Sequence, residues 1–209
     1  MNILITGADQ PLGRLLSEAL GKKYNVHAVG RDDCDHRDIE AIGARCQGMD
    51  VLLHCDIFDA PFESDVSCLD WASRGTYVMM QAALLAGVAR VIVASKLSLF
   101  DAYPDRFVID ETWQPQPDTH ADSLAPYLAE LTCREFARQG GLNALALRLG
   151  PLGHETGTKA EDVILAFEGA LHLEMESHGY RWQVFHISSL PRFATGLAER
   201  VLLHPKEGH

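Results

Sequence analysis

Short apolar runs alternate along the chain with segments in which apolar residues recur at helical spacing. The runs at 2–6, 25–29, 50–54, 90–95, 145–149 and 183–187 predict strands, and their continuous apolar character is typical of a parallel sheet. Helices are predicted at 12–20, after the N-cap residue Asp38, and at 74–86, 126–139, 161–174 and 193–203. Alternating strands and helices imply right-handed crossovers, so the sequence predicts an α/β Rossmann fold with a doubly wound parallel sheet.

Ligands of such sheets bind at the carboxyl ends of the strands, where the strand order reverses. The longest segment without clear periodicity is 99–125, which contains Pro104, Pro115 and Pro117. Loops of this length in compact domains are usually functional or mobile. We therefore expect the substrate side of any site to lie in 99–125.

Composition excludes several classes of partner. The formal net charge of −11 disfavours nucleic acid, because phosphate binding requires a basic surface. No apolar stretch approaches the roughly 18 residues that a membrane-spanning helix needs, so no membrane partner is expected. The five cysteines are scattered without a CxxC pair and no basic leader precedes the first strand, which predicts a cytoplasmic protein. The histidines form no compact ligand set, so we predict no metal site.

The first strand leads into TGADQPLG (6–13), a pattern typical of a loop that holds a pyrophosphate. Gly7 permits the tight turn, Gly13 lets helix and strand approach, and Pro11 suits the first helical turn. Gln10 stands where such loops usually carry a second glycine. If position 10 required a positive φ, glutamine would cost about 1–2 kcal/mol there. The prediction is a dinucleotide site, and the alternative is a tight turn without a ligand.

The end of the second strand bears on the choice of cofactor. A site for NAD usually has a carboxylate here for the ribose 2′-hydroxyl, but this chain has Gly30 and Arg31. Arg31 can pair with a 2′-phosphate, which favours NADP over NAD. The alternative is a solvated Arg31 balanced by Asp32 and Asp33, which would also repel a phosphate.

Six segments carry a family pattern in order: TGADQPLG (6–13), DVLLHCD (50–56), RGTYVMMQAALLAGVARVIVAS (74–95), DETWQPQP (110–117), PYLAELTCREFAR (126–138) and ALRLGPLG (146–153). Together they resemble the short-chain dehydrogenase/reductase superfamily, most closely its extended branch of epimerases, dehydratases and reductases. The resemblance implies a single domain over 1–209, with a cofactor-binding core over 1–150 and a reduced substrate side over 151–209. Most of the family's substrate cap, expected between 153 and 161, is missing.

The resemblance also implies roles for individual residues. The predicted catalytic residues are Tyr127, at the position of the family's tyrosine base, and Lys96, at that of its serine. The expected lysine four residues after Tyr127 is Leu131, which supplies no charge to stabilise a phenolate. Lys96 is either a replacement for that charge or a surface lysine. Asp38 and Ile39 resemble an adenine-contacting pair, although Asp38 as a helix cap is an equal alternative. The predicted cofactor-binding residues are Gly7, Gln10, Pro11, Leu12, Gly13, Arg31, Asp38, Ile39, Cys55 and Asp56.

Two functions follow, and the sequence does not decide between them. The first is an NAD(P)-dependent oxidoreductase or epimerase that transfers hydride on a hydroxyl or carbonyl substrate, such as a nucleotide sugar or a small carbonyl compound. The second is a catalytically degenerate sensor or partner subunit that binds a dinucleotide. A homodimer through the helices at 74–86 and 126–139 is open as well.

Overall fold

Six strands form one parallel sheet in the order β2-β1-β3-β4-β5-β6. The structure, a computed structural model, describes residues 1–58, 61–153, 157–175 and 181–203. The strands are β1 (Asn2–Thr6), β2 (Asn25–Val29), β3 (Val51–His54), β4 (Arg90–Lys96), β5 (Asn143–Leu149) and β6 (Trp182–Ile187). The chain leaves β1 toward β2 and then crosses to β3 on the other side of β1, so the strand order reverses between β1 and β3.

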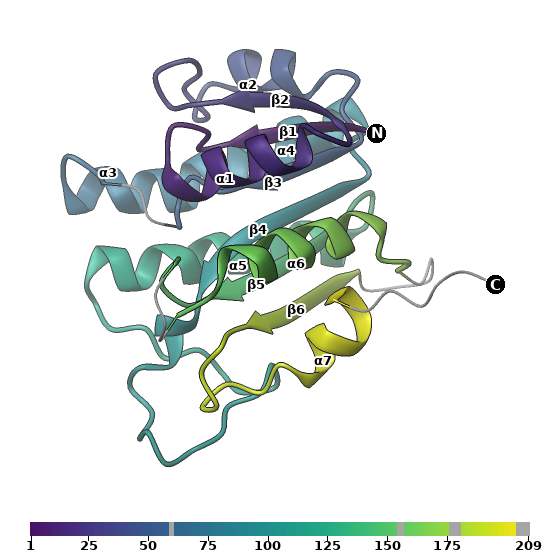
Figure 1. The fold of residues 1–209 in the computed structure, drawn as a ribbon. Helices are drawn as coiled ribbons and strands as arrows, with labels where there is room; N and C mark the ends of the chain where they lie inside the picture. The colour runs from purple at the N-terminus through teal and green to yellow at the C-terminus, as the bar shows by residue number, and fades with distance from the viewer. Residues whose placement is uncertain (59–60, 154–156, 176–180, 204–209) are drawn as a thin grey trace.

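Helices cover the sheet on two sides. They are α1 (Pro11–Leu20), α2 (Ile39–Cys46), α3 (Asp65–Asp70), α4 (Thr76–Ala86), α5 (Ala121–Gln139), α6 (Ala160–His172) and α7 (Gly196–Ala198). Figure 1 shows α1 and α6 in front of the sheet, with α4 and α5 behind it. None of the helices in the described ranges has both the length and the apolar character needed to cross a bilayer.

Each face of the sheet has its own apolar core, because side chains along a strand alternate between the two faces. Ile3 and Ile5 pack with Leu16 and Phe167 of α1 and α6. Leu4, between them, packs on the opposite face with residues of α2, α4 and α5. The predicted α/β fold with a doubly wound parallel sheet is confirmed.

The helix predicted at 126–139 begins five residues earlier, at Ala121. Pro126 therefore lies inside α5 and does not start it. A proline has no N–H, so the carbonyl of Asp122 lacks its usual helical donor. The helix continues through Pro126 because the burial of Ala121, Ala125 and Ala129 against the sheet offsets the missing hydrogen bond. The sequence placed the helix start at the proline, and that placement was wrong.

Two other boundaries differ from the prediction. The helix predicted at 74–86 is preceded by α3 and by a π-helical segment, Trp71–Gly75. At the C-terminal end, the helix predicted at 193–203 is only α7 followed by a π-helical segment, Glu199–Leu203. The segment 99–125 is also less irregular than predicted, because it starts within a 3-10 turn, Leu97–Phe100, and ends within α5.

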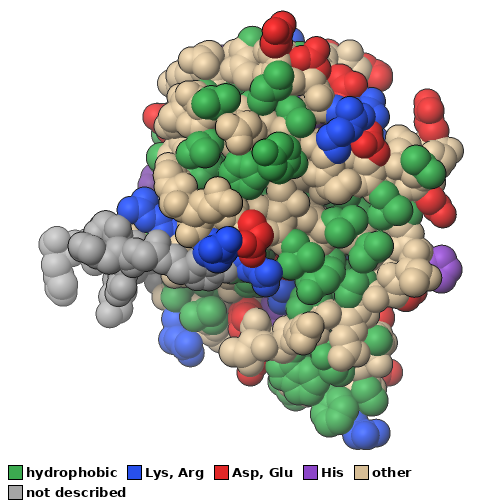
Figure 2. Space-filling view, turned by 180° about the vertical axis from the view of Figure 1, so that it is seen from behind, with side chains coloured by type: hydrophobic (Ala, Val, Ile, Leu, Met, Phe, Trp, Pro, Cys, Tyr) green, Lys and Arg blue, Asp and Glu red, His purple; other side chains and the backbone are tan. Residues whose placement is uncertain are grey.

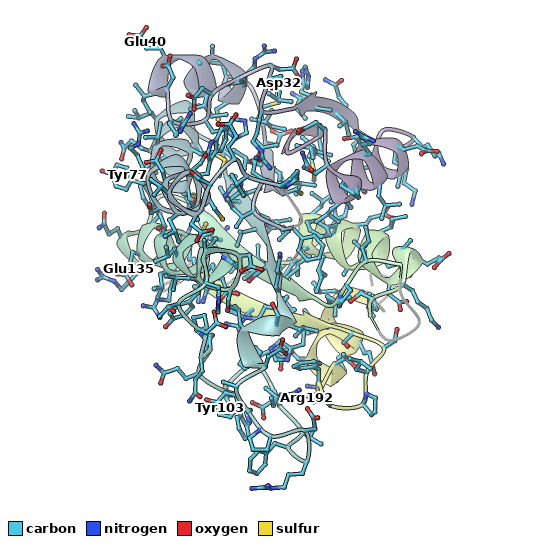
Figure 3. The ribbon with its side chains drawn as sticks, turned by 90° about the vertical axis from the view of Figure 1, so that its left-hand side faces the viewer. Asp32, Glu40, Tyr77, Tyr103, Glu135 and Arg192 are labelled. Atoms are coloured by element: carbon cyan, nitrogen blue, oxygen red, sulfur yellow. The ribbon has the colours of Figure 1, made fainter. Side chains whose placement is uncertain are left out.

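The remainder of that segment is fastened to the C-terminal part of the chain. The Arg192 guanidinium donates to the carbonyl oxygens of Phe100 and Tyr103 at 2.8 and 2.7 Å and pairs with Asp105. Ile109 and Phe193 form a single parallel β-bridge. Figure 3 shows Tyr103 and Arg192 close together at the lower end of the molecule. These contacts hold a long connection in place beside the carboxyl ends of β4 and β5.

Gly13 of α1 and Gly43 of α2 provide a test of how closely α1 packs against the end of β1. A Cβ atom at Gly13 would lie 2.2 Å from the carbonyl oxygen of Gly7, whereas a Cβ atom at Gly43 meets nothing within 4 Å. We expect Gly13→Ala to lower the free energy of unfolding by about 1–3 kcal/mol. The control Gly43→Ala should raise it by about 0.5–1 kcal/mol, because alanine is the better helix former. Urea unfolding measures both, and equal effects would contradict this account.

Candidate functional site

The loop between β1 and α1 is built from backbone packed against backbone. Gly7 has a φ of +68°, which favours glycine. A Cβ atom at Gly7 would lie 2.9 Å from the amide nitrogen of Asp56, so the ends of β1 and β3 are in close contact. The Gln10 amide donates to the Gly7 carbonyl oxygen at 2.9 Å and closes the turn. The loop therefore presents the N-terminus of α1 at the point where the strand order reverses.

Gln10 causes no backbone strain in this loop. Its φ of −99° and ψ of 160° are extended, so the condition under which glutamine would be costly is not met. Its side-chain amide donates to the Asp9 carboxylate at 2.6 Å. Pro11 occupies the first helical turn, which contains no acidic residue. Gly13, Leu12 and the turn thus form a cradle that fits a pyrophosphate at a helix N-terminus.

Arg31, which follows β2, has hydrogen-bond donors that are not used by the described residues. Its Nη1 atom donates to the Pro61 carbonyl oxygen at 3.0 Å, and its guanidinium lies 4.2 Å from the centre of the Phe62 ring and 5.6 Å from that of Trp71. The Nε and Nη2 atoms are buried and have no hydrogen-bond partner among the described residues. Buried donors without partners are costly, so this arrangement fits an anionic group that would accept from them.

Asp38 is the N-cap of α2. Its carboxylate accepts hydrogen bonds from the amides of Glu40 and Ala41, which confirms the capping role. Ile39 is 41% exposed. No described contact joins either residue to the β1–α1 loop, and their predicted contact with adenine remains a prediction.

A buried carboxylate with two histidines lies directly behind the loop. Asp56 Oδ2 is 3.1 Å from His36 Nδ1 and 3.2 Å from His54 Nδ1, and all three side chains are at most 2% exposed. His54 Nε2 lies 3.0 Å from the Thr76 hydroxyl. Burial alone would raise the pKa of Asp56, but the charges and hydrogen bonds of His36 and His54 outweigh it and hold this pKa well below its usual range.

The role of His36 in this cluster was missed, because nothing in the spacing around it marks a buried histidine. Its ring packs edge-on against Trp71 with centroids 5.1 Å apart. Asp56 Oδ1 is buried without a partner among the described residues. Cys55, beside it, is fully buried, and burial raises the pKa of its thiol well above the usual range. We conclude that Cys55 is packed as an inert thiol, whereas Asp56 ties β3 to the loop that contains His36.

Lys96, the last residue of β4, lies where three cavities meet. The loop cavity, about 540 Å³, is also lined by Ser98, Asp101, Asp118, His120 and Asp122. The α3 cavity, about 330 Å³, is lined by Phe62, Glu63, Asp65, Cys68, Asp122 and other residues. The β5 cavity, about 200 Å³, is lined by Phe58, Ser98 and the stretch 149–151. The Lys96 ammonium stands 5.9 Å from the centre of the Phe58 ring.

Tyr127 lines another cavity, of about 340 Å³, together with Leu131 and the ion pair of Glu130 and Arg148. That ion pair is buried, with guanidinium nitrogens 2.8 and 2.7 Å from the carboxylate oxygens. Lys96 and Tyr127, the two residues predicted to be catalytic, thus line different cavities, and their joint role stays a prediction. The residues of α5 that share a cavity with Lys96 are Ala121, Asp122, Ser123 and Ala125, and Tyr127 follows Ser123 by one helical turn.

Sequence reasoning missed Asp122. The signal that could have found it is the run of alanines at 121, 125 and 129, which has helical spacing and extends the helix before Pro126. From the segment 99–125, Asp101, Gln116, Asp118 and His120 line the loop cavity, and its expected place on the substrate side stays a prediction.

A groove also runs between α4 and α5 on the face shown in Figure 2, where hydrophobic side chains gather. It is lined by Tyr77, Leu84, Leu131, Phe136 and polar neighbours. Tyr77 is 55% exposed and packs edge-on against Phe136. Its side chain and that of Glu135 project outward in Figure 3. The homodimer expected through these helices stays a prediction.

The comparisons with known proteins agree with this geometry. The model of the NAD dependent epimerase/dehydratase family matches residues 3–200. The chain therefore belongs to that family, and a nicotinamide dinucleotide is the cofactor that the family and its relatives indicate.

Two curated relatives are each 27% identical to this chain over 71% of its length. One is an L-arabinose 1-dehydrogenase (NAD(P)(+)) of Haloferax volcanii, and the match covers 66% of it. The other, a uronate dehydrogenase of Pseudomonas syringae pv. tomato, is covered over 58% of its length. A solved short-chain dehydrogenase/reductase superfamily protein from Agrobacterium tumefaciens with bound NAD has the same fold. It has a TM-score of 0.80 at 15% identity, with 100% of this chain and 93% of that chain covered.

The buried cluster around Asp56 predicts a large effect of a small substitution. Asp56→Asn replaces the buried carboxylate that His36 and His54 contact with a neutral amide, and we expect the free energy of unfolding to fall by about 3 kcal/mol. The control Asp32→Asn, on the exposed part of the loop after β2, should change it by less than about 0.5 kcal/mol. Urea unfolding at neutral pH measures both changes in the free energy of unfolding. A similarly small decrease for both variants would mean that the cluster does not stabilise the fold.

Proposed function

We propose that the chain is a nicotinamide-dinucleotide-dependent oxidoreductase that acts on a hydroxyl group of a small, neutral, sugar-like substrate. The observation that supports this most is that the Gly7–Gly13 cradle and the Lys96 cavities lie at the same edge of the sheet. β1, β3 and β4 are neighbours in that sheet, so a dinucleotide over the cradle would extend toward Lys96.

The residues present fit the cofactor. Gly7, Gly13 and the first turn of α1 would hold the pyrophosphate, and Arg31 would meet the ribose end. The β5 cavity, with Phe58 and the stretch 149–151, has room for a flat ring. When bound, the nicotinamide ring would accept or donate a hydride. Lys96 would hold the substrate oxygen, because an ammonium stabilises the negative charge that develops there.

The unpartnered nitrogens of Arg31 support NADP as the preferred cofactor. A 2′-phosphate would accept hydrogen bonds from Nε and Nη2, and charge-assisted bonds of this kind are worth about 1.5–3 kcal/mol. We expect Arg31→Ala to weaken NADP binding at least about tenfold more than NAD binding. Calorimetric titration measures both affinities, with Arg45→Ala on the exposed side of α2 as the control. Equal losses for NADP and NAD would show that Arg31 does not select the cofactor.

The charges of the loop cavity support a neutral substrate. Asp101, Asp118 and Asp122 line it together with Lys96 and His120. His120 is paired with Asp118 at 3.0 Å, and that carboxylate raises the pKa of His120. The carboxylates outnumber the cations, so a substrate that carries its own carboxylate would be repelled.

This charge balance predicts a substrate preference. D-galactose and D-galacturonate differ only at C6, and we expect kcat/KM to be at least about tenfold higher for the neutral sugar. The double variant Asp101→Asn/Asp118→Asn should narrow that ratio, because it removes two of the repelling charges. Initial rates of NADPH or NADH formation with each sugar measure this ratio of kcat/KM values. A preference for the uronate in the unmodified protein would contradict the assigned substrate class.

A second function is favoured by a different observation. The lysine expected four residues after Tyr127 is Leu131, which supplies no charge. A protein that binds the dinucleotide without turning over a substrate, as a sensor or partner subunit, would fit this fact. Tight dinucleotide binding with no turnover of any neutral sugar or carbonyl compound would select this second function.

A further inference from the structure

Ser123 contributes a hydroxyl to the loop cavity that Lys96 also lines. It lies in the first turn of α5, whereas Lys96 is the last residue of β4. The Ser123 side chain is half-buried, and Ala125, two residues later, is buried against the sheet. The packing of α5 on the sheet therefore brings a hydroxyl and an ammonium to one cavity from two separate elements.

The hydroxyl oxygen of Ser123 is held by a hydrogen bond from the backbone. The Asp118 amide donates to Ser123 Oγ at 3.2 Å, which joins the start of α5 to the segment before it. A serine hydroxyl is both a donor and an acceptor, so an oxygen that accepts this bond still carries a hydrogen that it can donate. Ser123 is thus a positioned donor on the wall of the loop cavity.

The Asp118 carboxylate is the other acceptor near this hydroxyl, and His120 already engages it. Asp118 Oδ1 accepts from the His120 amide at 2.9 Å and lies 3.0 Å from His120 Nδ1. The hydrogen bonds from His120 lower the pKa of Asp118 most, and the contribution of Ser123 is the smallest. The hydrogen of Ser123 is therefore the donor least committed to this carboxylate.

Ser98 carries the other hydroxyl on the loop cavity. It lies in the 3-10 turn Leu97–Phe100 and is exposed. No hydrogen bond from the described residues holds its hydroxyl in one direction, whereas that of Ser123 is held by the Asp118 amide. Donors that are fixed before a substrate arrives stabilise charge best, because they need no rearrangement during the reaction. Ser123 meets this condition better than Ser98.

We propose that Ser123 donates a hydrogen bond to the substrate oxygen and shares that oxygen with Lys96. This assignment rests on the proposed function. In the oxidation, the hydroxyl proton leaves to the predicted acceptor Tyr127, and the carbon-bound hydrogen leaves with its electron pair to an oxidised nicotinamide. The substrate oxygen carries negative charge on the way to a carbonyl, and a donor aimed at it stabilises that charge. The hydrogen of Ser123 stays on Oγ throughout.

The main test uses the full chain with NAD or NADP and D-galactose. Ser123→Ala removes the donor, and we expect kcat to fall at least about tenfold. Ser123→Thr keeps the hydroxyl and should stay within about threefold of the unmodified protein. The matched control is Ser188→Ala, because Ser188 Oγ also accepts from a backbone amide, that of Leu190 at 3.0 Å, and lines none of these cavities. This control should leave kcat unchanged.

A second readout needs no turnover. D-galactono-1,4-lactone has a carbonyl oxygen, which only accepts hydrogen bonds, and calorimetry measures its Kd in the presence of NADH or NADPH. We expect Ser123→Ala to raise this Kd about fivefold and Ser123→Thr to raise it less than about twofold, because only the first removes the donor. The dinucleotide Kd should stay within about twofold in both variants. An equal rise of the lactone Kd in both variants would overturn the role of the hydroxyl.

The outcomes distinguish failure of the proposed function from failure of the role of Ser123. Dinucleotide binding without turnover in the unmodified protein would overturn the proposed function and the role of Ser123 with it. Turnover that survives Ser123→Ala would overturn the role of Ser123 alone. Turnover lost in Ser98→Ala but kept in Ser123→Ala would overturn it too, and would assign the donor to Ser98.

Discussion

The close approach of backbone segments at the end of β1 is the constraint on which the rest of the site depends. Gly7 lies against Asp56, and Gly13 lies against Gly7, at distances that leave no room for a Cβ atom. Because these residues have no side chains, α1 can begin directly beside the reversal point of the sheet. The helix N-terminus is then open to an anion, and every other element of the site is arranged around it.

Two buried polar clusters lie at the edges of this site, and they differ in kind. Glu130 and Arg148 are linked by two hydrogen bonds, which fix α5 against β5. Asp56 instead shares one oxygen between His36 and His54. Such buried groups are expensive to remove one at a time, so each pair determines position more than it adds net stability. The first holds α5 against β5, and the second holds the loop that carries His36 against the end of β3.

Much of the fold could be predicted because the physics that determines it is local. The buried strands are continuous apolar runs, and Gly7 and Gly13 mark a turn that few other residues can make. The start of α5 could not be predicted in the same way. Pro126 is a strong local signal for a helix start, but the burial of Ala121 and Ala125 against the sheet outweighs it. That energy depends on tertiary contacts, which the local pattern does not contain.

The early start of α5 adds a turn of helix before the predicted tyrosine. A helix that starts at Pro126 has Tyr127 in its first turn, whereas a helix that starts at Ala121 has Tyr127 one turn after Ser123. Ser123 lines the loop cavity with Lys96, and Tyr127 lines the cavity of Glu130 and Arg148. Leu131 supplies no charge to either cavity. The cations that line them include Lys96 of β4, Arg148 of β5 and Arg134 of α5, so the charges around the two cavities come from separate elements, and their arrangement depends on tertiary packing that the local pattern does not contain.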